Sequence, residues 1–127
     1  MDLNSLKLSD STTIEILNPR TQVATGMTVT LRSSDSPEIQ ALLRANQNKR
    51  IQQAQVSGKL VMTAEQREEE GTALLVAAVV DWSGFELDSK PLECTASNVR
   101  MILADPAYAW IRRQVDAAFG DQTRFFE

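Results

Sequence analysis

The longest apolar run of the chain covers Ala73 to Val80, eight residues without a polar side chain. The run is too short to cross a bilayer, which takes about 20 residues. Periodicity alone does not distinguish a helix from a strand in such a run. Its N-terminal flank favours a helix, because Thr63 and Gln66 form the Thr-x-x-Gln pattern of a capping box. We therefore expect a central helix over residues 64–81, buried all round in its second half, with Gly71 as the one position that also allows a break.

The end of this helix is expected at Asp81, where Trp82 and Gly84 turn the chain. A carboxylate at a helix C-terminus opposes the helix dipole. Asp81 is therefore expected to pair with a basic side chain such as Arg112 or Arg113. On this interpretation Asp81 and Trp82 have structural roles.

Two short segments near the N-terminus alternate between apolar and polar residues. Ile14 and Ile16 share one face of the first segment, and Val29 and Leu31 share one face of the second. This period of two predicts strands, and the turn residues Asn18-Pro19-Arg20-Thr21 between them predict a hairpin over residues 12–32. Two strands alone are marginal in water, so the hairpin is expected to pack on helices or on another subunit. Residues 1–11 are expected to be loose.

The rest of the chain predicts a helical region over residues 36–119. A first helix starts at Pro37 and ends before Gly58. Thr95 caps a short helix, and Asp105-Pro106 starts the last one. Its apolar stripe is Tyr108, Ile111, Val115 and Phe119, and a tail covers residues 121–127. The expected fold is a single α+β domain in which an N-terminal β-hairpin precedes about four helices, packed as a small, mainly helical unit.

The net charge and the numbers of histidine and cysteine residues argue against several classes of function. A net charge of −4 argues against a protein that binds nucleic acid through phosphate contacts. The chain has no histidine and one cysteine, Cys94. The missing histidine removes the commonest general base and most transition-metal sites, and a single cysteine forms no internal disulfide. We therefore predict no catalytic, cofactor-binding or metal-binding residue.

Acidic residues and the cysteine remain as candidates for chemistry. Glu68, Glu69 and Glu70 form a charge run that is typical of a solvated helix face. Cys94 precedes a helix N-terminus, where a thiolate is favoured. Without a histidine partner, we interpret Cys94 as a small apolar filler.

Two features are interpreted as partner-binding surface. One is the polar, basic half of the first helix, for which a solvated face is the competing interpretation. The other combines an aromatic residue at the edge of the last helix with two aromatics near the end of the sequence, which either pack on the core or bind a partner. The residues assigned to partner binding are Arg44, Lys49, Arg50, Trp110, Phe125 and Phe126, and those assigned to structure are Asp81, Trp82, Thr95 and Pro106.

Over residues 12–126 the chain resembles the tail assembly chaperones of long-tailed (siphovirus-type) bacteriophages and prophages. The resemblance rests on an ordered series: a turn between two strands, a long polar helix, an apolar segment, a tryptophan turn, a Thr-capped helix and a Pro-started helix. The segments that carry it are Asn18-Pro19-Arg20-Thr21, Ser34-Asp35-Ser36-Pro37, Val80-Asp81-Trp82-Ser83-Gly84, Leu87, Leu92-Glu93-Cys94-Thr95, Asn98-Val99, Ile102-Leu103-Ala104-Asp105-Pro106, Trp110-Ile111, Gln114-Val115 and Phe125-Phe126. Cys94 and Ala96-Ser97 depart from the commoner Phe-Thr-Pro-Glu form, which weakens that helix cap.

This resemblance implies a protein that is not an enzyme and needs no cofactor. Such chaperones bind the long, largely helical tape measure protein, keep it in solution, help to recruit tail tube protein and are absent from the finished virion. It also implies a homo-oligomer, without nucleic acid or membrane as a partner, in the cytoplasm of an infected or lysogenic bacterial host. In many such phages a frameshifted longer form contacts the tube protein.

Three other interpretations stay open. The chain is also compatible with a different phage assembly or protein-interaction module of similar fold. A small enzyme or ligand-binding domain would use Asp81, with a raised pKa, in a deep pocket beside Trp82. A nucleic-acid module would use the cations Arg44, Lys49, Arg50, Arg112 and Arg113.

Overall fold

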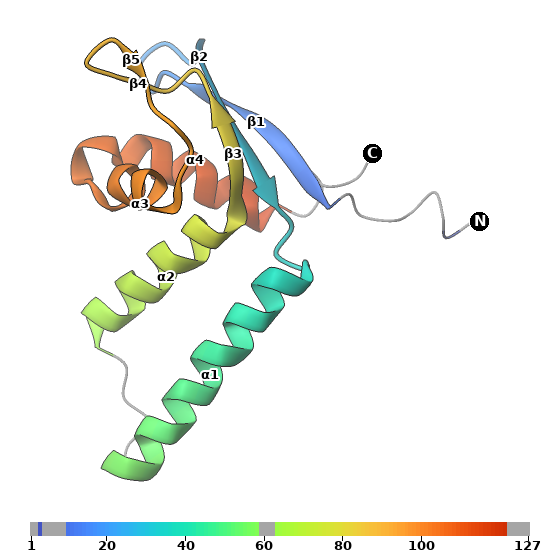
Figure 1. Ribbon diagram of the computed structural model, residues 1–127, viewed down its shortest axis with the longest axis vertical. Helices are drawn as coiled ribbons and strands as arrows, with labels where there is room; N and C mark the ends of the chain where they lie inside the picture. The colour runs from blue at the N-terminus through green and yellow to red at the C-terminus, as the bar shows by residue number, and fades with distance from the viewer. Residues whose placement is uncertain (1–2, 4–9, 59–62, 122–127) are drawn as a thin grey trace.

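The computed structural model describes residue 3 and residues 10–58 and 63–121, and it shows the expected α+β fold (Figure 1). Most of the expected loose N-terminus, the link at 59–62 and residues 122–127 of the tail, including Phe125 and Phe126, lie outside the described residues. The strands are β1 (Ser11–Leu17), β2 (Ala24–Arg32), β3 (Val79–Ser83), β4 (Glu86–Leu87) and β5 (Lys90–Pro91). The helices are α1 (Pro37–Ser57), α2 (Ala64–Ala78), α3 (Ala96–Ala104) and α4 (Ala109–Gly120).

The predicted hairpin is confirmed, and it is part of a three-stranded sheet. β1 pairs antiparallel with β2, and β2 pairs antiparallel with β3, so the order is β1-β2-β3. The turn between β1 and β2 is held by Asn18, whose side-chain oxygen accepts from the backbone N–H of Arg20 at 2.9 Å. One face of the sheet is apolar, and the other carries hydroxyl pairs such as Thr13 with Thr30 at 2.9 Å.

The predicted helix over residues 64–81 is wrong in its last turn. The helix ends at Ala78, and the next five residues form β3, which pairs with β2 in the register Val29↔Trp82 and Thr30↔Asp81. β-branched Val79 and Val80 suit a strand, and β2 offers unpaired backbone groups on its second side. The apolar run therefore divides between a helix and a strand, which also interrupts the helical region expected over 36–119. α2 itself is continuous through Gly71.

A single apolar core lies between the sheet and the helices. Its strand residues come from the inward face of β1, β2 and β3, and its helix residues come from α3, α4, the C-terminal half of α2 and the first turn of α1. The stripe predicted on the last helix is confirmed for Ile111, Val115 and Phe119, which are buried, while Tyr108 is partly buried. The other buried apolar residues are Ile14, Ile16, Val29, Leu31, Ile39, Leu75, Ala78, Val79, Phe85, Val99, Ile102, Leu103 and Ala118.

The predicted helix boundaries follow side-chain caps. The Thr63 hydroxyl accepts from the Gln66 N–H at 3.1 Å while the Gln66 side chain accepts from the Thr63 N–H at 3.0 Å, so the capping box is complete. Thr95 caps α3 through the Asn98 N–H at 3.1 Å. Asp105 and Pro106 start a 3-10 turn over Pro106–Tyr108, and α4 follows it directly. These local signals place the helices correctly because they need no distant partner.

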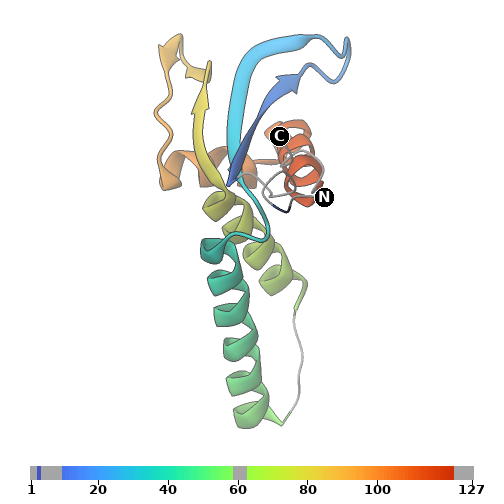
Figure 2. The ribbon, with the colours of Figure 1, turned by 90° about the vertical axis from the view of Figure 1, so that its right-hand side faces the viewer.

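Two helices project from the core as an arm (Figure 2). We define the arm as residues 40–58, which are α1 from its second turn and its C-cap, with residues 63–71, which are the N-cap and first half of α2. Between residues 40 and 56 of α1, and between 63 and 71, no side chain is buried. Val56 is 90% exposed and Ile51 is 45% exposed. Because most helical stability in proteins comes from packing, the arm is the least supported part of the described fold.

Candidate binding surfaces

A groove of about 600 Å³ lies between strand β1 and helix α4. β1 is an edge strand of the sheet, and α4 forms the opposite wall. Trp110, assigned to partner binding from the sequence, lines this groove and is half-buried. The other lining residues are Thr13, Ile14, Glu15, Leu17, Pro19, Gln22, Arg113, Gln114, Ala117 and Ala118.

Gln114 links the two walls of this groove, α4 and β1. Its side-chain oxygen accepts from the Leu17 N–H at 2.8 Å, and its side-chain nitrogen donates to the Leu17 carbonyl at 2.8 Å. An amide side chain that binds both the N–H and the C=O of one strand residue imitates a neighbouring strand. Sequence reasoning missed this role, because a glutamine beside an apolar stripe carries no signal of its distant partner.

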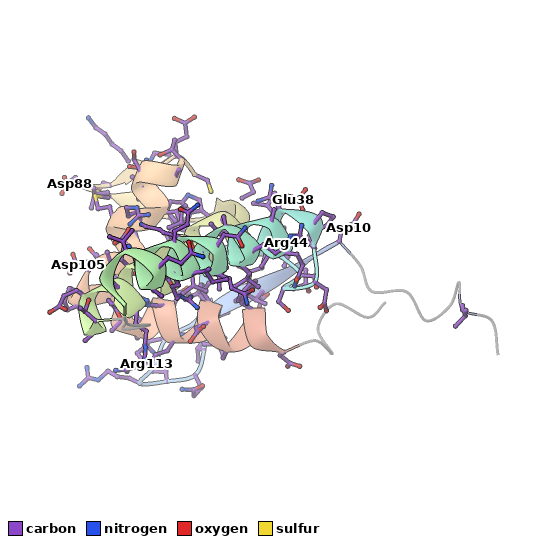
Figure 3. The ribbon with its side chains drawn as sticks, turned by 90° about the horizontal axis from the view of Figure 1, so that it is seen from below. Asp10, Glu38, Arg44, Asp88, Asp105 and Arg113 are labelled. Carbon is purple, nitrogen blue, oxygen red and sulfur yellow. The ribbon has the colours of Figure 1, made fainter. Side chains whose placement is uncertain are left out.

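A second groove, of about 240 Å³, lies between the two helices of the arm. Arg50 bridges them, because its guanidinium contacts the Glu70 carboxylate at 2.6 Å. Arg44 is exposed on α1 (Figure 3). Lys49 is exposed on the same helix. Of the three cations assigned to this surface, Arg50 therefore contributes to the arm itself, while Arg44 and Lys49 face solvent.

The solvated face expected for the Glu68–Glu70 run is confirmed for Glu68 and Glu69, which are exposed, while Glu70 is partly buried. Each carboxylate pairs with an arginine of a different helix: Glu68 with Arg112 at 2.9 Å, Glu69 with Arg100 at 2.6 Å and Glu70 with Arg50 at 2.6 Å. α2 is thus linked to α4, α3 and α1 in turn. Glu68 and Glu69 remain 71% and 67% exposed, so these two pairs are worth little in stability.

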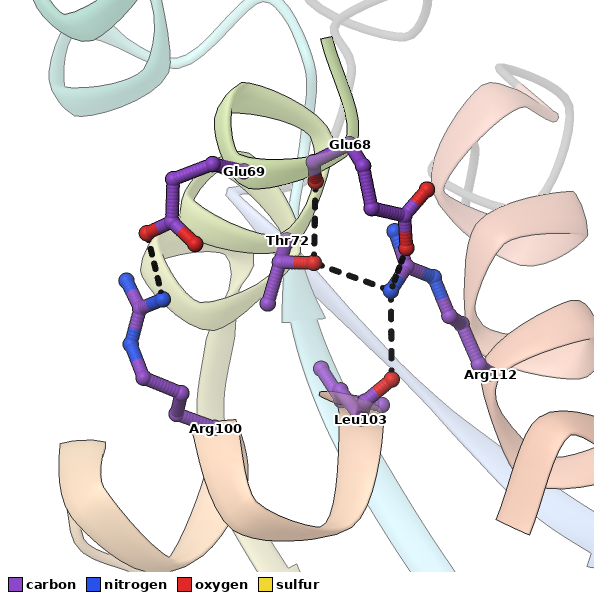
Figure 4. A network of polar contacts seen from close by, with 6 residues as sticks. All are labelled: Glu68, Glu69, Thr72, Arg100, Leu103 and Arg112. Atoms are coloured by element: carbon purple, nitrogen blue, oxygen red, sulfur yellow. Dashed lines mark hydrogen bonds and ion pairs between the residues drawn. The ribbon is translucent and has the colours of Figure 1, made fainter. Parts of the chain in front are cut away.

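Arg112 is the centre of the polar contacts between α2, α3 and α4 (Figure 4). Besides pairing with Glu68, it donates to the buried Thr72 hydroxyl at 2.9 Å and to the Leu103 carbonyl at 3.2 Å. Asp81 was expected to pair with Arg112 or Arg113; instead its carboxylate accepts from the Trp82 backbone N–H at 2.9 Å. The expectation failed because Asp81 lies on a strand rather than at a helix end.

Trp82 is a structural residue. Its indole N–H donates to the Leu92 carbonyl at 2.8 Å, and its ring stacks on Phe85 with centroids 4.2 Å apart. The cavity that Trp82 lines in the core measures about 10 Å³, room for about one water molecule. Gly84 follows at a positive φ, where a Cβ would overlap the carbonyl oxygen of Gly26. As far as the described residues form it, this cavity is too small to be the deep ligand pocket that the alternative hypothesis expects beside Trp82.

Cys94 packs at the margin of the core, as the apolar-filler interpretation expects. Burial raises the pKa of its thiol, with a smaller contribution from the negative charge of Asp81. A thiol with a raised pKa is mostly protonated at neutral pH and is a weak nucleophile. Within the described residues, no group of three or more acidic or cysteine side chains could hold a metal ion.

No protein-family model, curated protein or solved structure matches the chain. In the described part of the chain, no helix combines the length and hydropathy needed to cross a bilayer. Among the described residues, the candidate binding surfaces are the β1–α4 groove and the arm.

Proposed function

We propose that this protein is a tail assembly chaperone of a long-tailed bacteriophage or prophage. It binds the tape measure protein, keeps it in solution in the cytoplasm of the bacterial host, and helps to recruit tail tube protein. The proposal is supported by the ordered series of motifs over residues 12–126. Several of these motifs carry the local structure of the fold, including the Thr95 cap, the Asp105-Pro106 start and the Trp82 contact with Leu92.

The observation that carries the proposal is the arm. Two helices extend from the core without a buried side chain between residues 40 and 56 or between 63 and 71. An apolar side chain on such a helix gains free energy when a partner covers it, at about 25 cal/mol per Å² of area removed from water. Ile51 and Val56 are exposed there, with Arg44 and Lys49 on the same helix. A long helical partner fits this surface, because a helix lies along other helices in their grooves.

Many copies are needed to cover such a client. One arm is about 30 Å long, since α1 has 21 residues that rise about 1.5 Å each. A tape measure protein is far longer, so copies would bind side by side along it. Multivalent binding of this kind gives high avidity from weak individual contacts.

The test is capture from phage-producing cells through a tag at Met1, with partners identified by mass spectrometry. The wild-type protein should recover one very long helical protein together with many copies of itself. The double variant Ile51→Gln, Val56→Gln should recover much less of it, because glutamine keeps the helix but removes the apolar contacts.

A matched control is Val23→Gln, which removes a 62% exposed apolar side chain from the turn between β1 and β2. This variant should bind like the wild type. An equal loss of client recovery in both variants would show that the arm is not the client-binding site. Recovery of a different phage protein would favour another assembly module, and recovery of the bait alone would reject the proposal.

A further inference from the structure

Within α2, the boundary between the arm and the core falls at Gly71. No side chain between residues 63 and 71 is buried, whereas Thr72, directly after Gly71, is buried. On the other helix of the arm, Ile39 is buried in the first turn of α1, and no side chain between residues 40 and 56 is buried. Packing therefore fixes the bases of the two helices, and the direction of the arm beyond them depends on other contacts.

Two features weaken α2 at this boundary. Gly71 lies in the helix interior, where glycine is destabilising because it has the greatest backbone freedom. Thr72 donates its hydroxyl to the carbonyl of Glu68, four residues earlier, at 3.0 Å. A side-chain bond of this kind to the preceding turn often bends a helix. α2 is continuous here, so the helix is easiest to bend at the point where it leaves the core.

The side chain of Arg112 lies across this turn from helix α4 (Figure 4). Its Nη1 atom is 2.9 Å from a carboxylate oxygen of Glu68, 2.9 Å from the Thr72 hydroxyl and 3.2 Å from the Leu103 carbonyl. The Leu103 carbonyl belongs to the last turn of α3, where a cation is favoured. A Cβ at Gly71 would lie 3.6 Å from Arg112 Nη2, so the guanidinium also lies beside the glycine.

We propose that α2 has a hinge at Gly71 and that Arg112 holds this hinge in one conformation, so that a side chain of the core sets the direction of the arm. Arg112 contacts α2 on the arm side of the hinge through Glu68 and on the core side through Thr72. A group that binds both sides of a flexible turn opposes its bending. The guanidinium suits this role because its donors form a rigid planar fork.

The two helices of the arm turn together about this hinge. Arg50 of α1 contacts the carboxylate of Glu70 at 2.6 Å, directly before Gly71, and so links the helices on the arm side. Residues 40–55 of α1 rise about 22 Å, at about 1.5 Å per residue. A bend of about 20°, the size of a marked helix kink, therefore displaces the tip of the arm by about 8 Å.

Distances between two spin labels in the intact protein test the hinge. The labels are attached at Gln55→Cys on α1 and Asp116→Cys on α4, both exposed positions, in a Cys94→Ala background. The parent protein should give a narrow distance distribution. Arg112→Met removes the donors but keeps an unbranched side chain, and it should broaden the distribution by about 8 Å.

A matched control and a second-site substitution make this test specific. The control is Arg113→Met, at the next residue of α4, which is exposed and lines the β1–α4 groove. It should leave the distribution narrow. Adding Gly71→Ala to Arg112→Met should narrow the distribution again, because alanine stiffens the helix. A general loosening of the core would not be reversed at this position.

Glu68→Ala keeps the test decisive where Arg112→Met does not fold. The Glu68 side chain is 71% exposed, so its removal leaves the core intact and should produce part of the same broadening. A broad distribution in the parent protein would overturn the proposal. An unchanged distribution in Arg112→Met that folds, or in Glu68→Ala where it does not, would also overturn it, as would broadening that Gly71→Ala fails to reverse.

The hinge is independent of the proposed function, and only its use rests on that function. If the arm binds a long helical client, the hinge decides how the arms of neighbouring copies are directed along it. The distance measurements use no client. Failure of the hinge proposal and failure of the chaperone function are therefore distinguishable.

Discussion

The core of the molecule and its arm are both largely helical, yet they are stabilised in different ways. The core helices α3 and α4 each bury an apolar stripe in the core, with Val99, Ile102 and Val115 almost fully buried. The arm helices have no fully buried side chain along residues 40–56 and 63–71. They depend on the capping box at Thr63 and on the ion pair between Arg50 and Glu70.

This difference shows that the two regions leave different amounts of their helix surface exposed. A stripe of apolar residues at helical spacing holds its helix in place, because the stripe packs against other parts of the same molecule. A helix with local caps and a polar sequence keeps its shape but leaves its surface available. The arm is therefore suited to binding, and the core is suited to holding the arm and the groove in place.

The largest difference between the two regions is expected for the substitution Leu31→Ala in the core, compared with a matched substitution in the arm. Leu31 is fully buried on β2, and removing its side chain from the core should lower the free energy of unfolding by about 2–5 kcal/mol. Urea unfolding measures this value. Ile51→Ala, the matched substitution in the arm, should cost less than about 0.5 kcal/mol. Similar losses in both variants would mean that the arm shares the core.

Removing a threonine N-cap should cost less free energy than the core substitution. The loss should appear as lower global stability in the core but as faster local amide exchange in the arm. Thr63→Ala and Thr95→Ala each remove a hydroxyl that accepts from a helix N–H, at a cost of about 1 kcal/mol. In the core, Thr95→Ala should lower global stability in urea. In the arm, Thr63→Ala should instead speed amide exchange in the first turn of α2 several-fold and leave the unfolding midpoint almost unchanged. A full global loss from Thr63→Ala would contradict independent opening of the arm.

The ion pair across the arm should contribute least. A double-mutant cycle with Arg50→Ala and Glu70→Ala should give a coupling energy of at most about 1 kcal/mol, because the pair is partly exposed. High salt should reduce this coupling. The pair between Arg100 and Glu69, which is more exposed, serves as the control and should couple less. A larger coupling energy between Arg100 and Glu69 would show that solvent exposure does not decide which ion pair is stronger.

Local signals in the sequence placed most of the fold correctly. The Thr63–Gln66 capping box, the Thr95 cap and the alternation of Ile14 with Ile16 are all confirmed, because each depends on neighbouring residues. The last turn of the apolar run was assigned wrongly. Val79 and Val80 fit a helix or a strand equally well by pattern, and their state depends on the free side of β2.

The candidate surfaces were predicted only in part. Trp110 was assigned to binding, and it lines the β1–α4 groove. Arg50 was assigned to the same class, but it pairs with Glu70 inside the arm. No sequence pattern joins Gln114 to Leu17, which are 97 positions apart. The assignments of Phe125 and Phe126 stay predictions.

The sequence by itself determined where helices begin, which faces are apolar, and that the chain lacks the imidazole chemistry of many enzymes. These properties are set within a few residues, by hydrogen bonds to caps and by spacing. The tertiary structure decided that the apolar run supplies a third strand, that each glutamate of the Glu68–Glu70 run pairs with an arginine of a different helix, and that a groove opens beside Trp110. Those features depend on groups that are far apart in the chain, so only packing brings them together.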